Sequence, residues 1–438
     1  MSAMNWTRVD EGSHQTTTEQ LMELVVHPSN MGRAYRQVVG NKGSAGVDGM
    51  TVEDLLGHLR TNWEQMKRAL LSDSYHPQAV RPVEIPKPNG GIRQLGIPTV
   101  VDRLIQQALY QVLNALYDPT FTDYSYGFRP GRNAQQAVKQ SRDYIRQGKR
   151  WVVDVDLSKF FDEVHHDRLL AKLGQRIKDR RVIHLIDRYL RSGMMRNGVE
   201  EPRSKGTPQG SPLSPLLSNI VLDELDKELE RRGVSYVRYA DDFQIYVKTK
   251  RSAERVKAST KRFIEKHLRL KVNEEKSAVG RPWERDFLGY SFTMDKQTKL
   301  KPSKGSIKRF KQKIKEKFRQ GKGRNLSRFI REDLNPVLRG WGNYFNQSQT
   351  KGFSKDLDSW IRRHLRKLKW RQWKRPWPRM QELIRRGISE QRAAQSAFNQ
   401  RGAWWNAGAS HMNLALPGIY FAELGLVSLT HVLVRSNR

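Results

Sequence analysis

The stretch SYVRYADDFQIYV, residues 235–247, alternates apolar and polar residues on both sides of Asp241 and Asp242. A period of two residues is typical of a β-strand with one buried face. Because aspartate is common in turns, the stretch predicts two strands joined by a turn that carries adjacent carboxylates. On its own, this pattern is equally well explained by an aspartate-rich hairpin turn without a chemical role.

A second acidic strand is expected in WVVDVDLSKFF, residues 151–161, where Asp154 and Asp156 alternate with valines and so share one face. If this strand lies beside the hairpin, three or four carboxylates converge, which is unfavourable unless a cation neutralises them. Magnesium suits such a cluster because it prefers oxygen ligands and shares its coordination shell with substrate phosphates. Together the two stretches predict a site for two Mg²⁺ ions about 4 Å apart, with Mn²⁺ as the alternative ion.

The composition indicates a folded protein that binds a polyanion. The chain has 438 residues, 37% of them hydrophobic, enough for buried cores in about two to four domains. Its 80 lysines and arginines against 45 aspartates and glutamates give a net charge of +35. Residues 301–380 alone hold 25 basic and 5 acidic residues, so a nucleic-acid surface is expected there. The tryptophans of this segment are expected in its core: Trp341, Trp360, Trp370, Trp373 and Trp377.

Several classes of protein are excluded by what the sequence lacks. It contains no cysteine, which rules out disulfides and cysteine-ligated zinc sites. The first 20 residues hold no apolar signal segment, and no run of 18 apolar residues could span a membrane. We therefore expect a cytoplasmic protein without a membrane partner.

The remaining patterns predict an α+β core followed by helices. Ser214 and Pro215 are expected at the N-cap and the first position of one helix. The predicted elements are helices over 18–72 (interrupted by a glycine-rich stretch at 41–49), 100–117 and 214–232, two strands within 79–98, and a basic helical segment from 293 to about 380.

A loop that can approach a flat ligand closely precedes the predicted helix at 214. In KGTPQGSPLSPLL, residues 205–217, two glycines and three prolines surround Thr207 and Gln209. Lys87 and Arg93 on the earlier hairpin supply cations suited to a triphosphate. An ordinary loop before a capped helix is the simpler alternative, and spacing alone leaves both open.

Taken in order, these stretches resemble a known family. RWVVDVDLSKFFDEVHHDRL, GTPQGSPLSPLLSNI, RYADDFQIY, LKVNEEKS and FLGYSF are similar to the successive palm motifs of reverse transcriptases. NKGSAGVDGMT, IPKPNGGIRQLGIPTVVDRLIQQAL and SYGFRPGRNAQQAV resemble the fingers motifs of the group II intron-encoded subfamily, and LRGWGNYF its thumb. The resemblance covers nearly the whole chain from about residue 18 and is strongest to the short bacterial group IIC type, which lacks an HNH endonuclease.

The resemblance implies an RNA-directed DNA polymerase, a nucleotidyltransferase that extends a DNA primer on an RNA template with deoxynucleoside triphosphates. It also implies a maturase, which holds structured intron RNA in its splicing-competent fold and acts on a target DNA; the oligomeric state stays open. The implied architecture is a right-hand polymerase fold with an N-terminal extension (1–40), fingers and palm (41–295), a helical basic thumb or maturase X domain (296–375) and a small C-terminal DNA-binding-like segment (376–438).

Site residues can be carried over from the family by position. Asp156, Asp241 and Asp242 match its metal-binding triad. Asp156 is preferred to Asp154 because the family has an aromatic sugar gate five residues after its catalytic aspartate, where Phe161 stands. The matching nucleotide-binding residues are Lys87, Arg93, Gln209 and Lys276, with a surface ion pair as the alternative for Lys276.

The expected nucleic-acid contacts are less specific. Arg129 and Arg132 in GFRPGR match positions that contact template or stabilise the fingers. In the basic segment the expected phosphate contacts are Lys311, Lys315, Arg362, Arg363 and Arg366. Two other functions stay open at this point: a non-catalytic RNA-binding splicing factor, and a reverse transcriptase of the same subfamily recruited to host defence, DNA repair or spacer acquisition.

Overall fold

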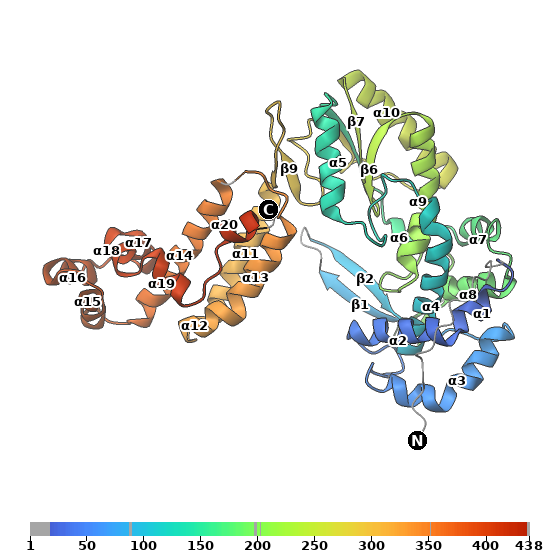
Figure 1. Ribbon diagram of the computed structural model, residues 1–438, viewed down its shortest axis with the longest axis horizontal. Coiled ribbons are helices and arrows are strands. Elements are labelled where there is room, and N and C mark those ends of the chain that lie inside the picture. The colour runs from blue at the N-terminus through green and yellow to red at the C-terminus, as the bar shows by residue number, and fades with distance from the viewer. Residues whose placement is uncertain (1–17, 87–89, 197–198, 202, 351, 436–438) are drawn as a thin grey trace. The chain divides into compact units, whose positions relative to one another are not determined.

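The computed structural model describes residues 18–86, 90–196, 199–201, 203–350 and 352–435 (Figure 1). The described chain divides into two compact units. The first comprises the described residues up to Ala137 together with Trp151–Gly280, and the second comprises Val138–Arg150 with the described residues from Arg281 onward. None of the helices in these ranges is long and apolar enough to cross a bilayer.

A four-stranded antiparallel sheet forms the centre of the first unit. Its strands follow in the order β6 (Ser235–Tyr239), β7 (Asp242–Val247), β3 (Trp151–Val155) and β8 (Ala278–Gly280). Helix α10 (Lys250–Phe263) packs against β3, β7 and β8, and α9 (Ser214–Arg231) packs against β6. Because β7 has four consecutive buried residues, Phe243–Tyr246, the sheet is covered on both faces.

The two predicted strands around the YADD motif are confirmed. Tyr239 lies opposite Asp242 in the antiparallel register, so the turn consists of Ala240 and Asp241. Ala240 adopts a left-handed backbone conformation with φ +57°, which is costly for a residue with a Cβ and requires support from neighbouring groups.

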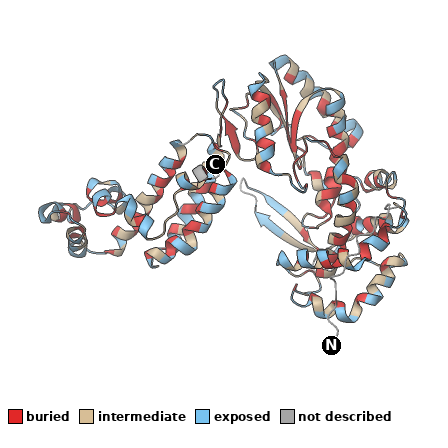
Figure 2. Cartoon of the chain, in the orientation of Figure 1, coloured by how far each residue is buried: buried red, intermediate tan, exposed pale blue. Residues whose placement is uncertain are grey.

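Helices surround this sheet, and a separate hairpin extends beside it. Strands β1 (Arg81–Pro86) and β2 (Ile92–Ile97) pair antiparallel as predicted, and their turn-proximal residues are exposed (Figure 2). The other elements assigned here are α1 (Leu21–Val26), α2 (Pro28–Gly40), α3 (Leu55–Leu71), α4 (Val100–Tyr117), the 3-10 helix η1 (Asp118–Thr120), α5 (Ala134–Arg146, shared between the units), α6 (Phe160–Glu163), α7 (His166–Gly174), α8 (Arg180–Arg191), β4 (Met194–Arg196), β5 (Val199–Glu201) and the π-helix η2 (Ile264–Leu268).

The predicted cap of α9 is wrong by one position. The helix begins with Ser214, and Leu213, which already has helical backbone angles, occupies the N-cap. The Ser214 hydroxyl donates instead to the carbonyl of Pro208 at 2.8 Å, inside the preceding loop. The serine therefore holds the loop against the helix start and does not cap the helix.

The second unit is mainly helical, with its own apolar core. Phe310 and Leu338 of the predicted thumb share this core with Leu416 and Phe421 of the predicted C-terminal segment. Its elements are β9 (Tyr290–Phe292), β10 (Leu300–Pro302), α11 (Lys304–Gln320), α12 (Leu326–Phe329), the π-helix η3 (Ile330–Leu334), α13 (Asn335–Tyr344), α14 (Gly352–Gln372), α15 (Pro376–Arg385), α16 (Glu390–Ala397), α17 (Ala403–Gly408), α18 (Ser410–Ala415), α19 (Gly418–Glu423) and α20 (Leu429–Arg435).

The tryptophans of the basic segment do not all lie in this core. Trp370 and Trp373 are buried as predicted, and Trp341 and Trp360 are half-buried against the core. The prediction is wrong for Trp377, which lies in the first turn of α15 with 62% of its surface exposed.

Candidate active site

The register of β3 against β7 brings the predicted carboxylates to one end of the sheet. Val155 lies opposite Phe243, and Asp156 follows Val155 while Asp242 precedes Phe243. In antiparallel strands these two positions face each other at the same end of the ladder. Asp241 lies in the turn immediately before β7, so the acidic strand and the acidic turn meet as the sequence predicted.

The carboxylates repel one another. The pKa of Asp242 is raised to about 7, first by desolvation and then by the negative charges of Asp241, Asp156 and Asp154. Because Asp242 is exposed at the surface, repulsion by the neighbouring carboxylates is the main physical reason for its raised pKa. The pKa of Asp241 is also raised, first by burial and then by Asp156, while Arg93 opposes the increase.

This donor set fits a cation that is shared with a substrate. Within the described ranges, no group of three histidine, aspartate or glutamate side chains is arranged to hold a metal ion by itself. Magnesium, however, is usually bound by one or two carboxylates together with substrate phosphates and water. Mutually repelling carboxylates at an accessible sheet end match that mode, and Asp156, Asp241 and Asp242 are the residues that would hold it.

The segment LKVNEEKS, residues 270–277, fixes the backbone of Asp156. The Asp156 amide donates to Ser277 Oγ at 3.0 Å, and the Asn273 amide donates to the Asp156 carbonyl at 2.8 Å. Lys276 of the same segment lies with its Nζ 3.6 Å from Asp156 Oδ2, and its side chain is 68% exposed. Lys276 thus forms the exposed ion pair that the sequence left as its alternative, with its ammonium beside the carboxylates.

A cavity of about 510 Å³ in the first unit is lined by three of the five predicted nucleotide-binding residues. Arg93, Phe161 and Gln209, which lie far apart in the sequence, all line it. The other lining residues, which the sequence did not single out, are Val38, Asn41, Leu95, Arg103, Gln107, Phe128, Gly210, Ser211, Pro212, Ser214 and Pro215. Lys87 lies outside the described residues.

Backbone contacts of the GTPQG loop build this cavity. The Thr207 amide donates to the Phe161 carbonyl at 2.6 Å, and the Gly96 amide of β2 donates to the Gln209 carbonyl at 2.9 Å. Gly206 has φ +87°, and a Cβ there would lie 2.9 Å from the backbone of Asp162. Only glycine therefore allows the loop to lie this close to Phe161.

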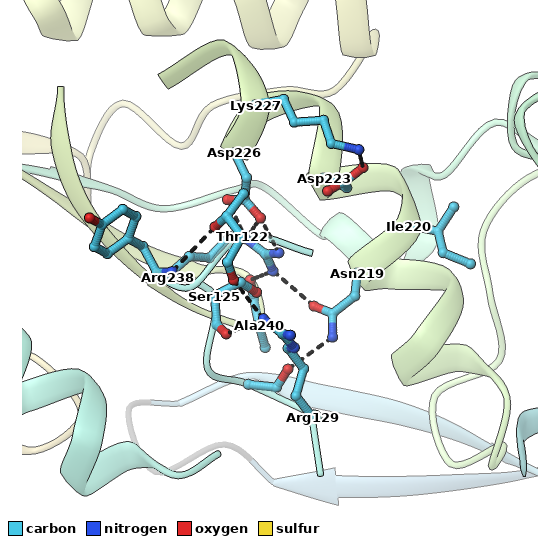
Figure 3. Close-up of polar contacts among 12 residues, drawn as sticks. Thr122, Ser125, Arg129, Asn219, Ile220, Asp223, Asp226, Lys227, Arg238 and Ala240 are labelled. Carbon is cyan, nitrogen blue, oxygen red and sulfur yellow. Dashed lines mark hydrogen bonds and ion pairs between the residues drawn. The ribbon is translucent and has the colours of Figure 1, made fainter. Parts of the chain in front are cut away.

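A buried polar network supports the turn between β6 and β7 (Figure 3). Arg238 is fully buried, and its Nε lies 2.8 Å from Asp226 Oδ1 on α9. Its Nη1 donates to Asn219 Oδ1 and to the Ala240 carbonyl, each at 2.9 Å. The guanidinium therefore ties the carbonyl before Asp241 to a helix.

The fingers motif SYGFRPG supports the same turn from the other side. Asn219 Nδ2 donates to the Gly127 carbonyl at 2.9 Å, and a Cβ on Gly127 would lie 2.2 Å from the Ala240 nitrogen. Asn219, Asp226 and Arg238 were not predicted as site residues from the sequence. The available signal was an arginine, Arg238, within a buried strand, which requires a buried partner.

The two arginines of GFRPGR are already paired within the protein. Arg129 forms an ion pair with Asp118 at 2.7 Å and donates to three carbonyls, with its side chain 5% exposed. Arg132 is paired with Asp123 at 2.6 Å and is more accessible. These contacts favour the fingers-stabilising role for Arg129 over contact with template.

The basic residues singled out in the second unit divide into two groups. Arg366 is buried and donates to the Leu416 carbonyl at 2.9 Å, and Arg363 donates to the Trp404 carbonyl at 3.0 Å. Lys311, Lys315 and Arg362 keep exposed or half-buried positions. Of the five predicted phosphate contacts, Lys311, Lys315 and Arg362 are thus the ones for which the structure shows accessible side chains without a backbone carbonyl partner in the described part of the C-terminal segment.

Comparison with known proteins matches both units. Residues 85–292 match the family "Reverse transcriptase (RNA-dependent DNA polymerase)", and residues 307–387 match "Group II intron, maturase-specific domain". Protein YkfC of Escherichia coli K12 is 33% identical over 301 residues, which cover 60% of this chain and 79% of that protein.

The group II intron-encoded protein LtrA of Lactococcus lactis is 30% identical over 371 residues, which cover 69% of this chain and 61% of LtrA. The matched part of this chain thus spans about three fifths of that relative. The palm motifs, the maturase-specific domain and these relatives agree on one assignment. The chain belongs to the group II intron reverse transcriptase and maturase family.

Proposed function

We propose that this chain is an RNA-directed DNA polymerase that also assists the splicing of a group II intron. The observation that carries the proposal is the meeting of Asp156 with Asp241 and Asp242 at one end of the sheet. The cavity lined by Arg93, Phe161 and Gln209 supports a nucleotide substrate. In the reaction, the primer 3′-hydroxyl attacks the α-phosphate of a deoxynucleoside triphosphate and pyrophosphate leaves.

Each site residue has a defined task in this proposal. Asp156, Asp241 and Asp242 would hold two Mg²⁺ ions, which would supply positive charge to the phosphates during the in-line displacement. Arg93 binds the triphosphate, and the aromatic ring of Phe161 fills the volume that a ribose 2′-hydroxyl would need. Lys276 protonates the leaving pyrophosphate.

The proposed maturase role accounts for the other nucleic acids that this protein would bind. The exposed cations of the second unit bind phosphates of a structured intron RNA, because folded RNA is recognised mainly by shape and backbone contacts. The polymerase site uses an RNA template and a DNA primer, and intron mobility adds a target DNA.

A primer-extension assay tests the proposal. Purified protein should extend a DNA primer on an RNA template with deoxynucleotides only when Mg²⁺ or Mn²⁺ is supplied. An Asp162→Ala protein is the matched control, because Asp162 is an exposed acid next to Phe161 without a task in the proposal. Absence of extension by the parent protein with either ion would overturn the polymerase function.

A further inference from the structure

A cavity of about 290 Å³ lies between α11 and α14 in the second unit. Its volume is at the lower end of the range for sites that hold one small ligand. Five of the eight residues that line it are cations and none is an acid. The lining residues are Lys315, Phe318, Arg319, Lys322, His364, Lys367, Leu368 and Arg371.

The floor of this α11–α14 cavity is aromatic. The rings of Phe318 and His364 are stacked, with centroids 5.0 Å apart and an interplanar angle of 25°. Trp360 and Trp404 also pack against the His364 ring, at centroid distances of 4.4 and 4.7 Å and interplanar angles of 68° and 53°. The imidazole is therefore held in place by three neighbouring rings.

His364 acts here as a neutral aromatic ring. Its pKa is lowered to about 4, first by burial and then by the positive charges of Lys367, Lys315 and Arg363. The pKa of Lys367 is also lowered, by burial and by Arg371 and Lys322. The cations around the cavity thus repel one another, and an anion placed among them would relieve this repulsion.

We propose that the α11–α14 cavity binds one unstacked nucleotide of a bound RNA, with its base against Phe318 and His364 and its phosphates between the cations of the two helices. An aromatic floor with a cationic rim is the combination that recognises unpaired nucleotides, because every base has a face that stacks. The inference rests on the proposed RNA-binding function and specifies which part of the RNA the second unit binds.

The test compares two RNA hairpins, one fully paired in its stem and one with a single-nucleotide bulge. Base stacking on aromatic side chains contributes about 5- to 150-fold in affinity per base. The parent protein should therefore bind the bulged RNA at least about 5-fold more tightly, and an abasic nucleotide at the bulge should remove this preference.

Two triple variants separate the cavity from general charge. Replacing Lys315, Lys367 and Arg371 by glutamine should weaken both complexes and abolish the preference for the bulge. The matched control replaces Lys308, Lys313 and Arg375, exposed cations of the same unit that do not line the cavity. It loses the same charge and should keep the preference.

A second pair of variants tests the floor without changing the net charge. His364→Phe keeps an aromatic ring and should keep the preference for the bulged RNA, whereas His364→Leu should lose this preference.

A parent protein that binds both RNAs equally, or a cavity variant that keeps the preference, overturns this inference alone. A parent protein that binds neither RNA overturns the proposed function instead. The inference about the cavity is also overturned if the parent protein prefers the bulge only in DNA. Displacement of the bound RNA by micromolar adenosine monophosphate overturns the same inference.

Discussion

Arg238 donates a hydrogen bond from Nη1 to the carbonyl of Ala240, 2.9 Å away, and so anchors the residue that precedes the acidic pair. Ala240 has the left-handed conformation that gives a two-residue turn, and this conformation is unfavourable for alanine. The same guanidinium is paired with Asp226, and both side chains are fully buried. The position of Asp241 thus depends on a polar network inside the fold.

Replacing Arg238 by methionine should destabilise the first unit by about 3–5 kcal/mol, because Asp226 would remain as an uncompensated buried charge. Urea unfolding measures this change. Lys227→Gln is the control, since Lys227 is 56% exposed in its ion pair with Asp223 and such pairs contribute about 1 kcal/mol or less. Equal losses in the two variants would contradict the role of the network.

Phe161→Val should allow ribonucleotides to be incorporated, because the smaller side chain removes the steric conflict with the 2′-hydroxyl. The measurement is the ratio of ribonucleotide to deoxynucleotide incorporation on one template. Phe160→Leu is a useful comparison, since Phe160 contacts Phe161 but is buried in the core. An unchanged ratio in Phe161→Val would mean that the gate lies elsewhere, and it would remove the family spacing that favours Asp156 over Asp154.

Neutralising Lys311, Lys315 and Arg362 to glutamine should lower the salt dependence of RNA binding. Each lost phosphate contact should reduce the slope of log affinity against log salt by about 0.7 to 0.9. Binding measured between 50 and about 200 mM salt gives this slope. A well-folded triple variant with an unchanged slope would show that these cations only face solvent.

Arg366→Gln should behave differently from that triple variant. Its Nε donates to the Leu416 carbonyl inside the second unit, so losing it should cost about 1–3 kcal/mol of stability. The salt dependence of RNA binding should stay nearly unchanged. Thermal unfolding together with the same salt titration separates the two effects, and a flatter slope with unchanged unfolding would assign Arg366 to the RNA surface.

The sequence was sufficient to predict elements whose pattern is local. Alternation around Asp241 and Asp242 predicted the hairpin, and the acids of residues 154–156 predicted the second strand. Their pairing was only a condition of the predicted cation site, and the register of β3 against β7 confirms it. The order of the family motifs then predicted that Arg93 and Gln209 both contact the nucleotide. In the structure, both residues line one cavity.

What the sequence did not predict depends on tertiary contacts. Nothing local indicates that Arg238 pairs with Asp226 and Asn219, because these residues lie on different elements. Likewise, helical spacing places basic residues on α14 without saying which ones meet carbonyls of the C-terminal segment. Arg363 and Arg366 were therefore expected at the RNA surface, although both donate to that segment.

Asp156 and Asp241 are the carboxylates on which the proposed polymerase reaction depends most. Their replacement by alanine, with Asp154→Ala as the matched variant on the same strand, can be followed by primer extension on an RNA template at saturating primer. We predict at least about 100-fold slower extension for Asp156→Ala and Asp241→Ala, with RNA affinity unchanged, because each loses charge stabilisation needed only in the reaction. Asp154→Ala should extend at a rate close to that of the parent protein. Near-normal extension by Asp156→Ala, together with loss of extension in Asp154→Ala, would contradict the account.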